Sequence, residues 1–115
     1  MSSDRMARIA ALVLAMLPAF AGNVFAQGGL SNLGHDLALR LCAPCHAIGP
    51  AERSPLATAP AFRHIEPRVD LNDMTQRLQE GIVAGHPEMP VFKLNELESR
   101  ALVAYLRSIQ SDRRN

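Results

Sequence analysis

The sequence predicts an all-α protein, and three observations support this. Three stretches, over 31–42, 70–84 and from Asn95 onward, repeat apolar residues at spacings of three and four, as an amphipathic helix does. No stretch alternates apolar and polar residues like a half-buried strand. Four prolines between Pro50 and Pro67 interrupt any helical period there. We therefore expect three main helices joined by long irregular loops.

The N-terminal segment is typical of a secretory signal peptide. Two arginines precede an apolar run over 9–21, and Val24-Phe25-Ala26 offers small residues at the two positions that determine cleavage. The run of 13 residues is shorter than the ~20 that a membrane-spanning helix needs. We predict cleavage after Ala26, which leaves a mature domain of 27–115 in the periplasm without an integral membrane span. A retained anchor is the alternative.

The charges of the predicted mature part balance. Residues 27–115 contain ten Lys or Arg and ten Asp or Glu, because Arg5, Arg8 and Asp4 belong to the signal. This balance excludes a strongly basic nucleic-acid binder and gives no strong electrostatic steering of a partner. A domain of 89 residues buries only a small hydrophobic core and usually needs a covalent cross-link or a bound metal to be stable. We expect a monomer.

The first predicted helix runs from Ser31 to Cys42. Its apolar stripe consists of Leu33, Leu37, Ala38 and Leu41. Ser31 or Asn32 is a plausible N-cap. Gly34 costs ~1 kcal/mol inside a helix, which indicates a close contact with another helix.

The helix leads into Cys42-Ala-Pro-Cys45-His46, a spacing typical of c-type haem attachment. Two thiols one short turn apart can each add to one vinyl group of a haem. The histidine that follows the second thiol can then bind the iron axially. The motif therefore predicts one haem c attached through Cys42 and Cys45, with His46 as an iron ligand.

Three other uses of two cysteines are weaker. A four-ligand zinc site would need His64 and His86, which are far apart in the sequence. A disulfide across so short a loop is strained and closes almost no chain. A thioredoxin-like dithiol follows a strand, and no β-rich run precedes Cys42.

Residues 47–68 form an irregular loop of about twenty residues, a length usual for functional segments. We expect the loop to wrap one face of the cofactor, with Leu56, Phe62 and Ile65 packed against it. A surface loop is the alternative for 50–59.

The second predicted helix spans Asp70 to Ala84. Asp70 or Asn72 caps it, and Gly81 and Gly85 end it. Its buried stripe consists of Leu71, Met74, Leu78 and Ile82.

Asn95 begins the third predicted helix, and Glu98 stands where a capping box requires an acidic residue. The apolar face of this helix consists of Leu97, Ala101, Leu102, Tyr105 and Ile109.

Two methionines follow the predicted signal. Met74 belongs to a helical stripe, where methionine usually fills a core. Met89 stands between Pro87 and Pro90 in a turn, which suits a rigidly held thioether. We predict that Met89 binds the iron opposite His46, with His86 as the rival ligand.

The chain resembles the small bacterial class I c-type cytochromes over 30–111. The matching residues are Gly34, the pattern Leu102-Val-Ala-Tyr105-Leu106, the segment Pro60-Ala-Phe62 and the methionine turn over 85–90. The resemblance implies a cytochrome c-like fold around one haem.

The resemblance also implies contacts for particular residues. Tyr105 is expected to pack across Gly34, and the carbonyl of Pro60 to accept a hydrogen bond from the second ring nitrogen of His46.

Two features depart from the family. Ala38 stands where larger members have an aromatic residue, and the Trp and Tyr that often bind the haem propionates are absent, with Arg63, Arg68 and Lys93 as possible substitutes.

These features predict a monohaem one-electron carrier that binds redox partner proteins transiently and is not an enzyme. Iron with both axial positions filled has no vacancy for a substrate. Two alternatives remain open: a sensor or enzyme for O2, NO or peroxide in which Met89 dissociates, and the cytochrome subunit of a dehydrogenase or oxidase.

Overall fold

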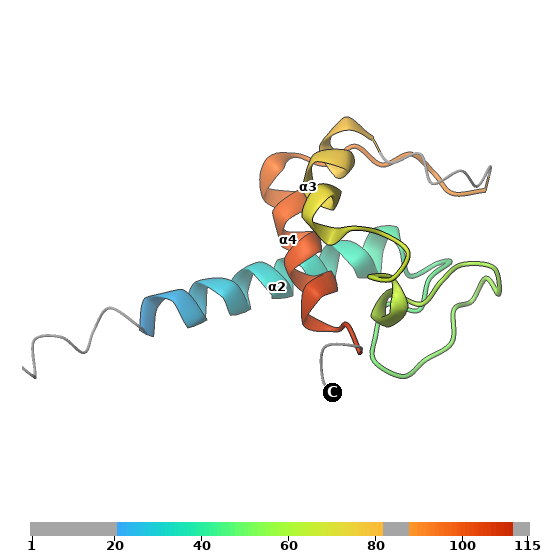
Figure 1. Cartoon of the computed structure of the whole chain (residues 1–115), viewed down its shortest axis with the longest axis horizontal. Coiled ribbons are helices and arrows are strands. Elements are labelled where there is room, and N and C mark those ends of the chain that lie inside the picture. Colours follow the sequence, from blue (N-terminus) through green and yellow to red (C-terminus); the bar gives the residue numbers. More distant parts are fainter. Residues whose placement is uncertain (1–20, 82–87, 112–115) are drawn as a thin grey trace, which may run out of the picture.

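The computed structural model describes residues 21–81 and 88–111, with side chains from Ala26 onward. Its elements are α2 (Ala21–Leu41), the 3-10 turn η1 (Phe62–His64), α3 (Leu71–Glu80) and α4 (Glu96–Ser108) (Figure 1). The described residues contain three α-helices and no strand, which confirms the predicted fold class. No helix in this part of the chain is both long enough and apolar enough to cross a membrane.

Helix α2 begins at Ala21, so the predicted start at Ser31 is wrong. The predicted caps, Ser31 and Asn32, lie inside the helix. No proline stands between Ala21 and Ser31, so nothing forces the helix to begin later. The predicted cleavage point after Ala26 falls within α2 and stays a prediction.

Helices α2 and α4 cross at Gly34 (Figure 1). A Cβ atom at this position would overlap the carbonyl oxygen of Ala101 and lie 2.8 Å from Cβ of Tyr105. Only glycine permits this approach, because the group in its way is backbone. The structure therefore confirms both the close helix contact and the packing of Tyr105 across it.

Helix α4 begins as predicted. The Asn95 side chain accepts a hydrogen bond from the Glu98 amide at 2.9 Å, and the Glu98 carboxylate accepts one from the Asn95 amide at 3.0 Å. This reciprocal capping box satisfies two helix-terminal donors. Leu97, however, is 57% exposed, so its place on the apolar face is wrong. The contact with α2 lies at Ala101, one turn further along.

Helix α3 is shorter than predicted. It begins at Leu71, where the Asp70 carboxylate accepts from the Asn72 amide at 2.8 Å, and it ends at Glu80, not at Ala84. Gly81 has φ +102°, a conformation that stops a helix and that other residues rarely adopt. Ile82 and Gly85 lie outside the described residues.

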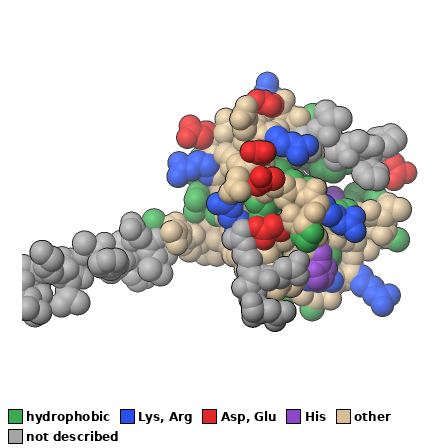
Figure 2. Space-filling model, viewed as in Figure 1, with side chains coloured by type: hydrophobic (Ala, Val, Ile, Leu, Met, Phe, Trp, Pro, Cys, Tyr) green, Lys and Arg blue, Asp and Glu red, His purple; other side chains and the backbone are tan. Residues whose placement is uncertain are grey.

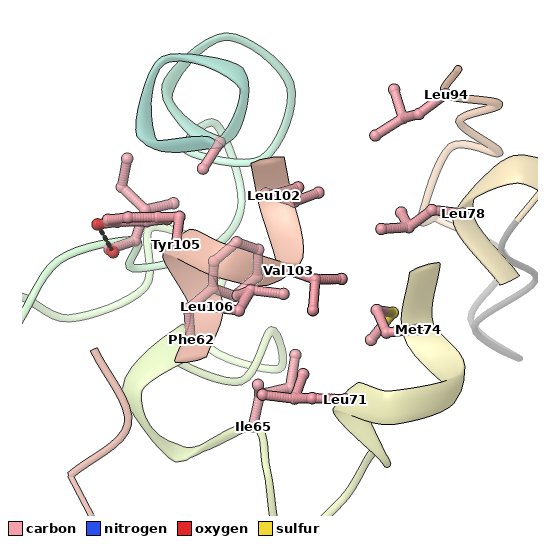
Figure 3. Close-up of a cluster of buried hydrophobic side chains, with 12 residues drawn as sticks. Phe62, Ile65, Leu71, Met74, Leu78, Leu94, Leu102, Val103, Tyr105 and Leu106 are labelled. Carbon is pink, nitrogen blue, oxygen red and sulfur yellow. Dashed lines mark hydrogen bonds between the residues drawn. The ribbon is translucent and has the colours of Figure 1, made fainter. Parts of the chain in front are cut away.

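The core lies between α3, α4 and the loop before α3 (Figure 3). Met74 and its neighbours Leu71 and Leu78 point from α3 toward the side chains of α4, and all three are buried as predicted. The guanidinium of Arg107 on α4 also donates to Asn72 at 2.9 Å, which ties the start of α3 to α4.

Candidate functional site

The Cys42–His46 motif forms one helical turn directly after α2. The amides of Cys45 and His46 both donate to the carbonyl of Cys42, at 3.1 and 2.9 Å. Residues three apart in such a turn project from the same side. Both thiols are free and partly buried. The turn therefore presents two thiols side by side, followed at once by an imidazole.

Cys42 packs against the hydrophobic core. Burial raises the pKa of its thiol to about 11, because the apolar surroundings disfavour the charged thiolate. Before haem is attached, Cys42 is therefore a neutral thiol at physiological pH.

His46 has a fixed orientation. Its Nδ1 lies 2.8 Å from the carbonyl oxygen of Pro60, which the resemblance implied. A carbonyl can only accept, so Nδ1 carries the proton and Nε2 keeps its lone pair for a metal. The ring of Phe62 lies 4.9 Å from the imidazole at an interplanar angle of 36°, and it is buried. Together these contacts restrict rotation of the imidazole.

The loop after His46 folds back onto the motif. The Leu56 amide donates to the carbonyl of Cys45 at 3.1 Å, and the Phe62 amide donates to that of Ala47 at 2.9 Å. Leu56 is 37% exposed, whereas Phe62 and Ile65 are buried in the core. The turn η1 adds a short 3-10 segment to a loop that was predicted to have no regular structure.

Residues of α4 and its C-terminal end hold this loop from the other side. The Tyr105 hydroxyl donates to the carbonyl of Ile48 at 2.5 Å. The Gln110 side-chain Nε2 donates to the carbonyl of Phe62 at 2.8 Å, and the Ser111 hydroxyl donates to that of Arg63 at 2.9 Å. The sequence did not single out Gln110 or Ser111, because partners 48 residues away leave no local pattern.

Met89, the predicted second ligand, is half-buried in a bend before Pro90. Among the described residues, no hydrogen bond or ring contact joins Met89 to His46 or its neighbours. The segment 88–95 and the loop 43–61 project from the same end of the helical body (Figure 1). His86 and Pro87 lie outside the described residues.

The three cations considered for propionates differ in their contacts. Arg63 donates to the carbonyl of Glu52 at 2.8 Å, whereas Arg68 and Lys93 are exposed. Acidic and basic side chains are interspersed over the face shown in Figure 2. That face therefore has no patch of a single sign.

The described residues fit a covalently attached haem. The fit rests on two free thiols one turn apart and on an imidazole whose Nδ1 is already engaged, so that Nε2 is the nitrogen available to iron.

Comparison with known proteins supports the same assignment. No protein-family model and no solved structure matches the chain. A curated protein, cytochrome c-552 of Bradyrhizobium diazoefficiens, is 31% identical over 99 residues, which cover 86% of this chain and 90% of that protein. With this identity, this coverage and the helical architecture, the chain belongs to the c-type cytochromes, the electron-transport proteins that carry covalently bound haem c.

Proposed function

We propose that residues 27–115 form a class I monohaem cytochrome that carries single electrons between redox proteins in the periplasm. The observation that supports this best is the hydrogen bond from His46 Nδ1 to the Pro60 carbonyl, at 2.8 Å. It leaves Nε2 as the free nitrogen on a residue directly beside two free thiols. Such an orienting bond is the usual partner of a histidine that binds a metal.

Each site residue has a distinct task in this proposal. Cys42 and Cys45 would form the two thioether links to the haem, and His46 and Met89 would bind its iron. The bound haem supplies the chemistry, a change between ferric and ferrous iron that takes up or releases one electron. Pro60 holds the Nδ1 proton of His46, and the buried ring of Phe62 limits movement of the imidazole.

Ligation by Met89 sets the function apart from catalysis. A thioether sulfur favours ferrous iron and raises the reduction potential, and it fills the position at which a substrate would bind. The chain would then move electrons without binding a small molecule, and it would meet its partners through small, short-lived contacts.

Replacing Met89 with alanine tests the proposal. We expect the reduction potential of the variant to fall and its reduced form to bind carbon monoxide. The reduced wild-type protein should not bind carbon monoxide. Met74→Leu is the matched control, because Met74 is buried in the core at 5% exposure and leucine keeps its volume. That variant should keep the wild-type potential.

An unchanged potential in Met89→Ala would contradict the assignment. A fall on His86→Ala instead would identify His86 as the ligand. Export is tested separately by sequencing the N-terminus of the protein from the periplasmic fraction, which should begin at Gln27.

A further inference from the structure

Gln110, two residues after the end of α4, is unusual because it is polar and only 2% exposed. Its Nε2 donates to the carbonyls of Phe62 at 2.8 Å and Leu106 at 2.7 Å, and its Oε1 accepts from the Glu66 amide at 3.1 Å. The side chain therefore uses both donors and its acceptor, and each partner is a backbone group. A buried amide with this many partners fixes the backbone around it.

The backbone that Gln110 holds is the part that orients His46. The Phe62 carbonyl receives the Gln110 bond, and the Phe62 amide donates to Ala47, the residue after His46. Pro60, two residues before Phe62, accepts the Nδ1 proton of His46. The segment 60–62, whose last residue begins η1, thus contacts the imidazole at one end and Gln110 at the other.

We propose that Gln110 is a positioning residue that acts on His46 through the segment 60–62. By fixing the Phe62 carbonyl, it holds the Pro60 carbonyl at hydrogen-bond distance from Nδ1. This inference rests on the proposed function, in which His46 Nε2 binds the haem iron.

The direction of the effect follows from the chemistry of the imidazole. A strong hydrogen bond from Nδ1–H makes Nε2 a better electron donor, and a better donor stabilises ferric iron more than ferrous iron. When the Pro60 carbonyl is held less firmly, this donation weakens. Loss of the Gln110 amide should therefore raise the reduction potential.

Other contacts limit the size of the effect. Ser111 still donates to the Arg63 carbonyl through both its hydroxyl and its amide, at 2.9 and 3.1 Å. The turn η1 should therefore stay attached to the end of α4 in a Gln110 variant. The expected outcome is a looser Pro60 carbonyl and not a detached loop.

The test is Gln110→Leu in the haem-loaded protein. At a fixed ambient potential, the ratio of ferrous to ferric protein should rise about threefold, which is about 28 mV at 59 mV per tenfold for one electron. Proton NMR of the reduced protein should show the Nδ1 proton of His46 exchanging with solvent about tenfold faster. If Gln110 contributed only to stability, its substitution would change neither the reduction potential nor, selectively, the exchange rate of this Nδ1 proton.

Arg107→Ala is the matched control. Arg107 lies on α4, three residues before Gln110, and also donates hydrogen bonds to a distant segment, but its partners are Leu71 and Asn72 at the start of α3. We expect this variant to lose stability while it keeps the wild-type potential and the slow Nδ1 proton. If Gln110→Leu shifts the potential no more than Arg107→Ala does, the inference is wrong.

A second variant and the wild-type spectrum complete the test. If Gln110→Leu does not fold, Ser111→Ala should show a smaller shift in the same direction, and no shift there overturns the inference. The wild-type spectrum separates the two proposals. Absence of histidine ligation in the wild type refutes the proposed function, whereas normal ligation with an unshifted variant refutes only the role of Gln110.

Discussion

The crossing of α2 and α4 and the loop that follows His46 are stabilised in different ways. At the crossing, Gly34 meets the backbone of Ala101, and the apolar side chains around them are buried. In the loop, order depends on single hydrogen bonds, such as those that the Ile48 and Phe62 carbonyls accept. The crossing is therefore set by shape, whereas the loop combines buried apolar side chains, among them Phe62 and Ile65, with individual long-range hydrogen bonds.

Tyr105 belongs to both regions. Its Cβ lies against Gly34, its ring contacts the His35 ring edge-on at 5.1 Å, and its hydroxyl donates to Ile48. Changes at Tyr105 can therefore separate the contribution of the crossing from that of the loop.

The largest effect is expected from Gly34→Val. The new side chain would overlap the Ala101 carbonyl, and no rotamer can relieve a clash between Cβ and backbone. We expect a loss of at least ~4 kcal/mol of unfolding free energy, measured by chemical denaturation of the haem-loaded protein. Gly29→Val is the control, because nothing lies within 4 Å of a Cβ atom there. Similar losses in the two variants would contradict the crossing as described.

The same contrast explains what the sequence could predict. The capping box of Asn95 and Glu98 and the cap at Asp70 are local, because donor and acceptor lie within three residues. Gly34 indicated the crossing, because a glycine destabilises a helix interior and is expected there only where another segment comes close. The Cys42–His46 spacing predicted the kind of site because the covalent chemistry itself requires that spacing.

The predictions that were wrong concern features that depend on distant parts of the chain or on the absence of a stop signal. The α2 start at Ala21 could not be found by looking for a cap at Ser31. The contacts of Gln110, about which the sequence made no prediction, are also distant, since its side chain donates to the Phe62 carbonyl, 48 residues away. Leu97 has the correct helical spacing, yet it lies in the first turn of α4, before the contact with α2 at Ala101.

The second prediction concerns Tyr105 and uses two variants. Tyr105→Ala removes the ring from the crossing and should cost about 3 kcal/mol, as deletions of buried aromatic rings do. Tyr105→Phe keeps the ring and removes only the bond to the Ile48 carbonyl, so it should cost about 1 kcal/mol. Thermal unfolding measures both. Equal losses would mean that the hydroxyl accounts for the whole effect and the ring for none of it, against the contrast between the two regions.

The contribution of the Tyr105 hydroxyl should also appear in the unfolding free energy at alkaline pH. Burial and, secondly, the nearby charge of Glu52 raise the pKa of Tyr105. Above the ordinary tyrosine pKa of about 10, the unfolded chain releases this proton more readily than the folded one does, so stability falls as the pH rises. The contribution is complete below about pH 10. Tyr105→Phe should remove that part of the alkaline slope, measured as unfolding free energy between pH 9 and 11.

The smallest effect is expected from Glu52→Gln, which acts only within the loop. The exposed Glu52 carboxylate accepts from the Gly49 amide, and hydrogen bonds from the backbone amides of Glu52 itself and of Gly49 lower its pKa. Because the folded state holds this proton less tightly, its stabilising contribution is present above the ordinary glutamate pKa of about 4.3 and is lost as the pH falls below it. The variant should therefore lose part of the acid dependence and little stability at pH 7.

Glu80→Gln on α3 is the control for the loss of one carboxylate, since its partner Gln76 lies on the same helix and not in the loop. Unfolding free energy between pH 3 and 7 compares the two variants with the wild type. A loss in Glu52→Gln as large as that in Gly34→Val would place the loop within the cooperative helical core. In that case shape alone would no longer account for the stability of the body, because one exposed polar contact would support it equally.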